Sequence, residues 1–555
     1  MTSPSFQARL RAAIPDGSDP PTLPSRASLA AASASLPRRP SSHSTGASTG
    51  ASAKGEEKDN DGTYLAPLGA EATLTHILTD IVPALNGQAR SGRYYGFVTG
   101  GTLPVAEAAD NIVSALDQNV QVHLPEQTVA TEVESVALGM LADVLGLEDG
   151  SGGGEGGVWK GKTFTTGATA SNILGLACGR EYVIAKRGGN VGEQGLLGAC
   201  VSAGVKGVRV LTSMGHSSLS KAASVVGIGR ANVTELPLSA DEPWRLDLEG
   251  VERVLREGEE GGVVSIIAVG AGEVNTGRFA TGGKGEMERL RGLADRFGAW
   301  IHVDGGELFS LLSFFFVLVC GEILLTIVGL TAFGIFARAL EAKPEFAKIR
   351  EMASGVELAD SITVDGHKLL NVTNVWREQP YDCGMFFCRS LPTQTAVFTN
   401  PNAAYLSSAG ASAIPSPLNI GLENSRRFRA LPAYAVLRSE GRRGLAAILG
   451  RMVVLARKLA VWIRASKAYE LLPEGAWDIE GMTHMVVLFR ARDEGLNEEL
   501  VGRINGTREV YVSGTSWKGR KAVRVAVGSW RVDVERDFEV VTRVLGDIAK
   551  AWARE

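Results

Sequence analysis

The sequence has few cysteines, few histidines and a low net charge. Each of these argues against one class of structure or partner. Five cysteines among 555 residues are an odd number without zinc-ligand spacing, which favours a reduced compartment over a disulfide framework. The seven histidines include no H-E-x-x-H pattern, so the sequence indicates no metal site. A net charge of −4 argues against nucleic acid or another polyanion as a partner.

The N-terminal region lacks the apolar residues that a core requires. Serine, alanine, proline and glycine dominate residues 27–54, a composition that favours disorder. Arginines among the serines would suit an organellar transit peptide, but the aspartates and prolines favour a plain tail, and no secretory apolar core is present. We therefore predict a disordered tail at 1–62 and a cytoplasmic protein, with a mitochondrial location as the alternative.

The remaining chain has the composition of a globular protein, since 45% of all residues are hydrophobic and 21% are charged. Short apolar runs alternate with helical segments such as Met287–Phe297. The runs that predict strands are Val208–Thr212, Val263–Val269, Ala299–Val303 and Ser361–Val364. Strands separated by helices predict an α/β fold with a mostly parallel, doubly wound sheet, whose ligands bind at the carboxyl ends of the strands.

Three structured regions follow the predicted tail. A helical segment is expected at 63–150, and a glycine-rich loop at Gly150–Gly157 ends it. A large domain is expected at 151–430. Apolar runs at 485–489 and 523–527, with a helical pattern to Trp552, predict a small C-terminal α+β domain at 431–555.

Two hydroxyl- or histidine-bearing turns could bind a cofactor. Thr165–Asn172, with the sequence TTGATASN, precedes an apolar helical run, and a glycine turn at a helix start presents backbone N–H groups that suit a phosphate. The alternative for this turn is an ordinary N-cap. His216 follows a predicted strand and could stack on a flat heteroaromatic ring, although a lone histidine is more often structural.

Two charged residues follow the next predicted strands. Asp304, in His302-Val-Asp304, could pair with a pyridinium N–H and so keep an electron-accepting ring protonated; the alternative is a helix N-cap. Lys368, in Asp365-Gly-His-Lys368, could form an imine with an aldehyde once it has lost its proton; the alternative is a surface lysine. The order of the four features favours a shared site.

These motifs make the chain resemble the pyridoxal-phosphate-dependent decarboxylases of the aromatic-L-amino-acid, tyrosine and glutamate decarboxylase type. The resemblance runs from about Tyr94 to Arg429, and its most specific pieces are His302-Val-Asp304, Asp365-Gly-His-Lys368 and Pro380-Tyr-Asp-Cys-Gly384. It implies a lyase with the aspartate aminotransferase-like fold, in which the large domain at 151–430 binds pyridoxal 5′-phosphate. The implied reaction converts an L-amino acid to the amine and CO2, and the implied assembly is a homodimer.

The resemblance also assigns roles to residues. It implies that Lys368 is the Schiff-base lysine, Asp304 the partner of the pyridine nitrogen and His216 the stacking residue. It further places a second set of residues at the cofactor: Ala168, Thr169, Thr99, Asn275 and His367. Asn275 belongs to Gly272–Gly277, GEVNTG, where Glu273 replaces a usual hydroxyl residue.

An apolar insertion interrupts the family pattern directly after Asp304. Removing Gly306–Thr331, 26 residues counted inclusively, restores the sequence HVDGAFGIFARAL. One interpretation is a membrane span, but Glu322 near its middle would be costly in lipid and the span would begin inside the sheet. The others are an apolar segment that packs on a partner and a retained intron translated in frame. We favour the intron, because Gly306-Glu307 can encode a GTGAG donor and Thr331-Ala332 an AG acceptor.

Two smaller departures bear on activity. Residues 373–379 separate the lysine motif from Pro380-Tyr-Asp-Cys-Gly384, and a misplaced splice acceptor would explain them. Residues 407–422 contain no tyrosine, whereas many relatives place there a tyrosine that returns a proton to the substrate carbon. The alternatives to decarboxylation are therefore a related lyase or aldehyde-forming enzyme, or an impaired product of mis-splicing. Glutamate, diaminobutyrate and aromatic amino acids all fit the scaffold as substrates.

Overall fold

The computed structural model describes residues 21–37, 67–88, 90–97, 100–148, 158–214, 217–304, 332–371, 382–399 and 414–555. These residues form two compact units, Met1–Ser91 and Gly92–Glu555. Among the helices in these ranges, none is long and apolar enough to cross a bilayer. The apolar insertion at 306–331 lies outside the described residues.

The first unit contains helix α2 (Arg26–Ser35) and helix α3 (Ala70–His76), which continues as η1 (Ile77–Ile81) and η2 (Val82–Ala84). The prediction of disorder from residue 27 is therefore wrong for α2. Five of its ten residues are alanine, the best helix former. The Ser25 side chain caps it by accepting the Ser28 N–H at 2.9 Å.

The second unit is built around a seven-stranded sheet in the order β2-β8-β7-β6-β5-β3-β4. Its strands are β2 (Gly161–Thr165), β3 (Gly207–Thr212), β4 (Val233–Glu235), β5 (Val263–Gly270), β6 (Trp300–Asp304), β7 (Ser361–Asp365) and β8 (Gly384–Cys388). Strand β8 runs antiparallel to both of its neighbours, and the other pairings are parallel. The four predicted strands are thus confirmed as β3, β5, β6 and β7.

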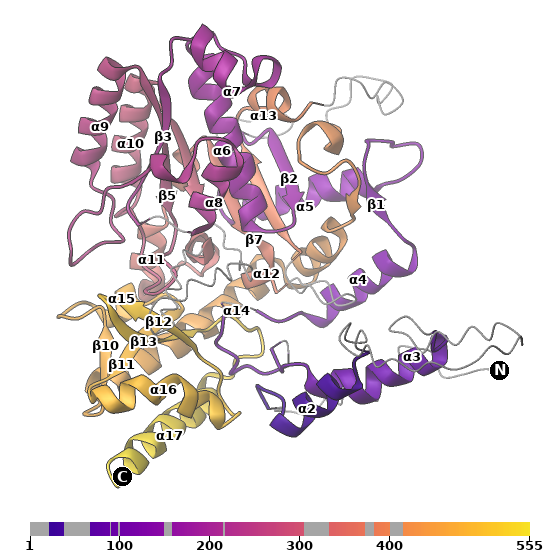
Figure 1. The fold of residues 1–555 in the computed structure, drawn as a ribbon, viewed down its shortest axis with the longest axis vertical. Helices are drawn as coiled ribbons and strands as arrows, with labels where there is room; N and C mark the ends of the chain where they lie inside the picture. Colours follow the sequence, from indigo (N-terminus) through magenta and orange to yellow (C-terminus); the bar gives the residue numbers. More distant parts are fainter. Residues whose placement is uncertain are drawn as a thin grey trace, which may run out of the picture. The chain divides into compact units, whose positions relative to one another are not determined.

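Helices cover both faces of this sheet (Figure 1). Alternate residues of each strand enter different cores, as the two-residue period of a strand requires. Ile266 and Trp300 pack with α6, α7 and α8, whereas Ile267 and Ile301 pack with α5, α9 and α10. The bounds are α4 (Pro104–Ala115), α5 (Ala130–Val144), α6 (Ala168–Ala185), α7 (Val191–Ser202), α8 (Ser217–Val225), α9 (Leu248–Gly261) and α10 (Lys284–Phe297).

Short elements connect this sheet to the C-terminal part. They are η3 (Arg230–Asn232), η4 (Ala332–Ala339), η5 (Pro344–Phe346), α11 (Ala347–Met352), η6 (Val356–Leu358), α12 (Gly366–Leu369), α13 (Leu391–Phe398) and η8 (Pro417–Asn419). A two-stranded ladder pairs β1 (Asn119–Val120) with β9 (Arg426–Arg427). The long helix α14 (Ala430–Ala465) follows and is interrupted at Gly441, whose φ is 57°.

The chain closes with a four-stranded antiparallel sheet in the order β10-β11-β13-β12. Its strands are β10 (Tyr469–Leu472), β11 (Val486–Ala491), β12 (Ser513–Trp517) and β13 (Arg520–Ala526), accompanied by α15 (Ile479–Met482), α16 (Glu494–Gly506) and α17 (Val534–Trp552). The predicted α+β ending is confirmed. The boundaries proposed at residues 62, 150 and 430 stay predictions.

Candidate active site

The carboxyl ends of the parallel strands bring the predicted site residues to one edge of the large sheet. Asp304 is the last residue of β6, and Asp365 is the last residue of the neighbouring β7. Gly384, the first residue of antiparallel β8, pairs with Asp365 on one side and with Thr165 on the other. The ends of β2, β6 and β7 and the start of β8 therefore share this edge.

Lys368 lies in the short helix α12 directly after β7, and only 2% of its surface is exposed. Its Nζ lies 3.1 Å from Asp365 Oδ2. The other oxygen of Asp365 lies 2.7 Å from His367 Nδ1. A buried carboxylate between a lysine and a histidine is a group that can accept the lysine proton. The surface-lysine alternative is excluded.

The family motif that ends at Gly384 packs against the turn formed by residues 365–368, the lysine turn. The carbonyl oxygen of Cys383 accepts the backbone N–H groups of Gly366 and His367 at 3.0 and 3.2 Å. A Cβ on Gly366 would lie 2.9 Å from Cys383 Sγ, so the motif approaches the turn too closely for another side chain. Residues 373–379 lie outside the described part of the chain.

A glycine loop packs on the other side of the lysine turn. A Cβ on Gly100 would lie 2.3 Å from the carbonyl oxygen of Lys368. The Leu103 N–H donates to the carbonyl of Asn371 at 3.0 Å, which fixes this loop to the chain just after Lys368. The structure therefore brings Gly100 to the lysine turn, whereas Thr99 lies outside the described residues, so its role stays a prediction.

Asp304 is 3% exposed and accepts a hydrogen bond from Asn172 Nδ2 at 3.0 Å. Asn172 lies in α6, in the second turn of the helix that the predicted phosphate motif begins. Its Oδ1 accepts from Thr363 Oγ1 of β7 at 2.9 Å and lies 2.9 Å from His302 Nε2. No role was predicted for Asn172, although it is the last residue of the TTGATASN motif. Its position at the end of that motif was the available signal.

The predicted phosphate turn begins helix α6. Gly167 precedes the helix with φ 154°, and both Ala168 and Thr169 are buried. Inside the turn, the Thr165 hydroxyl lies 2.7 Å from Ser171 Oγ and donates to the Gly167 carbonyl at 3.1 Å. The first N–H groups of a helix have no intrahelical partner, so this 18-residue helix directs donors and a positive dipole end to the sheet edge.

The loop that carries Asn275 is closed by the residue that departs from the family. Glu273 accepts the N–H groups of Asn275 and Thr276 at 2.9 and 2.8 Å, and the Thr276 hydroxyl at 2.7 Å. Burial raises the pKa of the Glu273 carboxyl, and these hydrogen bonds oppose the rise. The Asn275 side chain accepts from Thr515 of β12 at 2.8 Å. The structure thus gives Asn275 a partner in the C-terminal sheet, and its cofactor role stays a prediction.

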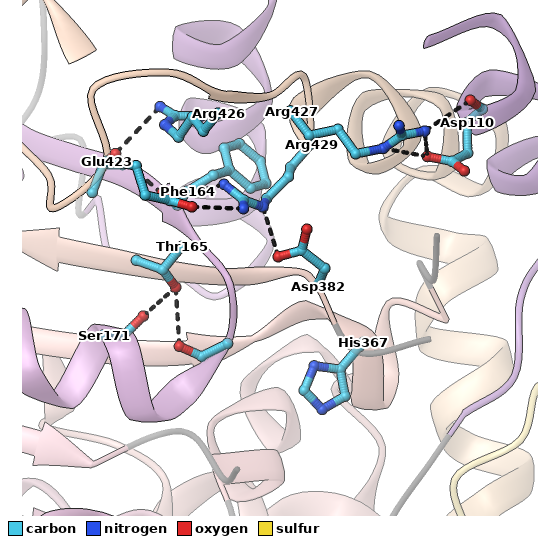
Figure 2. A network of polar contacts seen from close by, with 12 residues as sticks. Asp110, Phe164, Thr165, Ser171, His367, Asp382, Glu423, Arg426, Arg427 and Arg429 are labelled. Atoms are coloured by element: carbon cyan, nitrogen blue, oxygen red, sulfur yellow. Dashed lines mark hydrogen bonds and ion pairs between the residues drawn. The ribbon is translucent and has the colours of Figure 1, made fainter. Parts of the chain in front are cut away.

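Three arginines, Arg426, Arg427 and Arg429, form ion pairs with residues around this edge (Figure 2). Arg429 binds Asp382 at 2.8 Å and Glu423 at 2.9 Å, next to the Cys383 carbonyl that holds the lysine turn. Burial raises the pKa of the Asp382 carboxyl, and Arg429 opposes that rise. Arg427 binds Asp110 of α4 at 2.6 Å.

The residues on either side of the insertion both hydrogen-bond to Ala271. The Ala271 N–H donates to the carbonyl of Asp304 at 3.2 Å, and the Ala271 carbonyl accepts the N–H of Gly334 at 3.1 Å. A Cβ on Gly334 would lie 2.3 Å from that carbonyl oxygen. His216, like the insertion and residues 400–413, lies outside the described residues, so its stacking role stays a prediction.

Comparisons with known proteins point in one direction. Residues 344–491 match the pyridoxal-dependent decarboxylase conserved domain. An L-2,4-diaminobutyrate decarboxylase of Acinetobacter baumannii is 26% identical over 73% of this chain and 68% of its own length. The structure of Oryza sativa TDC with PLP and tryptamine matches with a TM-score of 0.67 and 21% identity over 90% of this chain and 92% of that one. Rhodiola rosea 4-hydroxyphenylacetaldehyde synthase matches with a TM-score of 0.68 and 18% identity over 98% and 96%. At these identities, the two solved structures establish the fold.

Proposed function

This chain belongs to the pyridoxal-phosphate-dependent decarboxylase family, and we propose that it removes the carboxyl group of an L-amino acid as CO2 and leaves the amine. The predicted family, fold, cofactor and enzyme class, a carboxy-lyase, are confirmed. The observation that carries the proposal is the buried Lys368 at the sheet edge where β6 ends in the buried Asp304.

The residues at this edge fit the chemical groups of pyridoxal phosphate. An aldehyde requires an amine, and Lys368 is a buried amine with a carboxylate 3.1 Å away. A pyridine nitrogen that is to stay protonated requires an acid partner, and Asp304 is a buried carboxylate at the same edge. A phosphate requires backbone donors, which the start of α6 at Ala168 and Thr169 supplies. His367 is the additional donor that we assign to the phosphate.

Asp365 is the proton acceptor that we assign to Lys368. An ammonium group does not attack a carbonyl carbon, so the lysine must first lose a proton. The Oδ2 atom of Asp365 is within hydrogen-bond distance of Nζ, and its Oδ1 faces His367. Burial of all three groups excludes water from this exchange.

Loss of CO2 leaves an electron pair on the α carbon of the amino acid. When bound, pyridoxal phosphate supplies the ring that accepts this pair. Asp304 would hold the ring nitrogen of the bound cofactor, because a neighbouring carboxylate favours the protonated ring. The carbon must then receive a proton to give the amine.

Aldehyde formation is the second candidate, and the absence of tyrosine from residues 407–422 favours it. That reaction would combine the amino acid with O2 and water and yield the aldehyde, CO2, ammonia and hydrogen peroxide. The two candidates share CO2 as a product, so they are separated by the amine on one side and by peroxide and O2 consumption on the other.

A homodimer and a cytoplasmic location also belong to this proposal. Large apolar side chains on α4 and at α5 are more than half exposed in the single chain: Ile112 at 51%, Leu116 at 63%, Val129 at 59% and Val136 at 51%. Contact with a second copy would remove this surface from water. Sedimentation at micromolar concentration tests the dimer, and cell fractionation tests the location.

Incubation with a panel of amino acids, including glutamate, 2,4-diaminobutyrate and aromatic amino acids, tests the function. The chain is used at full length and without Gly306–Thr331, each with native Lys368, Lys368→Ala or the control Lys550→Ala, which changes an exposed lysine. We expect amine and CO2 from at least one substrate with native Lys368 and with the control, and none with Lys368→Ala. Equal product from Lys368→Ala would contradict the assignment. Peroxide and aldehyde in place of amine would select the second candidate.

A further inference from the structure

Asn172 hydrogen-bonds to residues of three other elements around the candidate site. It stands at the end of the phosphate motif, and its Nδ2 donates to Asp304 at 3.0 Å and to Ser218 at 3.3 Å. Ser218 is the second residue of α8. The Oδ1 atom of Asn172 accepts a hydrogen bond from Thr363, which lies five residues before Lys368. One fully buried amide thus reaches α8, β6 and β7 from α6.

His302 completes the hydrogen bonding of this amide. Its imidazole is fully buried, and burial lowers its pKa to about 3, so the ring is neutral at ordinary pH. A neutral imidazole has one N–H, which donates, and one bare nitrogen, which accepts. Its Nε2 lies 2.9 Å from Asn172 Oδ1, and its Nδ1 lies 2.8 Å from Ser361 Oγ.

The Asp304 carboxylate at one end of this series, which only accepts, and the Trp300 indole at the other, which only donates, give the hydrogen bonds a single direction. A carboxylate only accepts, so the amide nitrogen of Asn172 faces Asp304 and its oxygen faces His302. The oxygen only accepts, so Nε2 carries the proton of His302. Nδ1 then accepts from the Ser361 hydroxyl. The Ser361 oxygen in turn accepts from Trp300 Nε1 at 2.9 Å.

We propose that Asn172 and His302 are positioning residues that aim the Asp304 carboxylate at the cofactor ring through this one-directional chain of hydrogen bonds. The inference rests on the proposed role of Asp304 as the partner of the ring nitrogen. Every donor in the chain, from Trp300 through Ser361 and His302 to Asn172, is directed toward Asp304. Both positioning residues act through Asp304.

The helix that carries Asn172 also makes room for the imidazole. A Cβ on Gly175 would lie 2.2 Å from His302 Cε1 and 2.5 Å from Nδ1. Gly175 lies one turn after Asn172 on α6. A methyl group at this position would push the imidazole away from Asn172 without removing a hydrogen-bonding group.

Two substitutions of His302 distinguish the role of Nε2 from that of Nδ1. The amide nitrogen of His302→Gln can occupy the position of Nε2 and still donate to Asn172. The shorter side chain of His302→Asn ends near the position of Nδ1 and leaves Asn172 without that donor. Gly175→Ala displaces the ring by contact, and Gly139→Ala on α5, where nothing lies within 4 Å of the added Cβ, is the matched control.

The first measurement is made without the cofactor. Nitrogen NMR of histidine-labelled protein, at full length and without Gly306–Thr331, reports which nitrogen carries the proton, and His302→Gln identifies the signal by its loss. We expect a neutral His302 with the proton on Nε2 from pH 5 to 8. A proton on Nδ1, or titration near the ordinary histidine pKa, would overturn the inference whether or not the protein binds pyridoxal phosphate.

The second measurement is the affinity for pyridoxal phosphate and the pH dependence of its visible spectrum once bound. A hydrogen bond to a charged group contributes enough that its loss corresponds to about ten- to a hundredfold in affinity. We expect His302→Asn, Asn172→Ala and Gly175→Ala to weaken binding by that factor and to shift the spectrum's pH dependence. We expect His302→Gln and Gly139→Ala to match the parent. Equal binding by His302→Asn and His302→Gln would refute the inference.

The two proposals fail in different ways. If borohydride reduction attaches no pyridoxal phosphate to Lys368 in either version of the chain, the proposed function fails. The position of the His302 proton then still tests the direction of the hydrogen bonds from His302 to Asp304.

Discussion

Deletion of Gly306–Thr331 should yield a chain that folds and binds pyridoxal phosphate at least as well as the full sequence. The structure supports this expectation because the flanking residues Asp304 and Gly334 bond to the N–H and the carbonyl of the same residue, Ala271. The two hydrogen bonds are 3.2 and 3.1 Å long, and about 4 Å of covalent bonds separate the nitrogen and the carbonyl oxygen of Ala271. The carbonyl oxygen of Asp304 and the backbone nitrogen of Gly334 are therefore no more than about 10 Å apart.

The shortened connection can span this distance. Three residues, 305, 332 and 333, would remain between Asp304 and Gly334 in place of 29. They reach about 10 to 11 Å when extended, which requires Ala332 and Phe333 to leave the start of η4. Loop-closure entropy scales as (3/2)RT times the logarithm of length, so reducing 29 residues to 3 favours folding by about 2 kcal/mol. Both estimates predict that the deletion costs no stability.

Urea unfolding followed by circular dichroism, and titration with pyridoxal phosphate followed by visible absorbance, measure the two effects. We expect an unchanged or higher free energy of unfolding and a larger soluble fraction for the deleted chain. A deleted chain that unfolds more easily, or that loses cofactor binding that the full sequence has, would refute the reasoning. Sequencing of the spliced transcript tests the origin: a mature message that still encodes the 26 residues would contradict the retained intron.

Three further predictions concern described residues. Glu134→Ala should lower the free energy of unfolding by about 3 to 5 kcal/mol, because it leaves the buried Arg426, bonded to both oxygens of Glu134, without its partner; urea unfolding measures the loss. The raised pKa of Glu273 means that its contribution to stability is fully present below its unfolded value of 4.5 and declines as pH rises through the folded value. Relative to Glu273→Gln, the native chain should therefore lose stability as pH rises. Gly100→Ala should reduce occupancy of Lys368 by the cofactor, since the new Cβ would lie 2.3 Å from the lysine carbonyl.

Each of these expectations has a contrary result. A loss below about 1 kcal/mol for Glu134→Ala would place the ion pair among the weak surface pairs. A pH-independent difference between Glu273 and its glutamine variant would mean that burial does not govern this carboxyl. Full cofactor occupancy in Gly100→Ala would mean that the loop can move away from the lysine turn.

The sequence predicted the parallel core well because its strands are apolar on both faces. Runs such as 263–269 are buried by helices on either side of the sheet, and continuous apolar segments are the signature of that burial. Strand β2 was missed because its sequence, GKTFT, is short and half polar. Strand β8, with the sequence GMFFC, is a short apolar run that was not predicted as a strand, and its antiparallel place between β2 and β7 depends on pairing with residues far away in the sequence.

The candidate site was predictable where a motif follows a strand. Asp304 and Lys368 were found because each stands at a strand end in a recognisable motif. Asn172 and His302 were not assigned, because their importance comes from hydrogen bonds across 130 residues. Asp365 belongs to the lysine motif, but its contacts to Lys368 and His367 depend on the turn that α12 makes.

The antiparallel strand β8 has a consequence for synthesis of the protein. Thr165 of β2 pairs with Gly384, so β2 emerges from the ribosome about 220 residues before its partner. Until β8 arrives, β7 also has an open edge, and unpaired edges of nascent sheets are sites of aggregation. A message that ends or shifts frame anywhere between these strands would therefore release a chain with two exposed edges. An insertion that keeps the reading frame leaves β8 in the chain, so only a message that loses β8 keeps the sheet open.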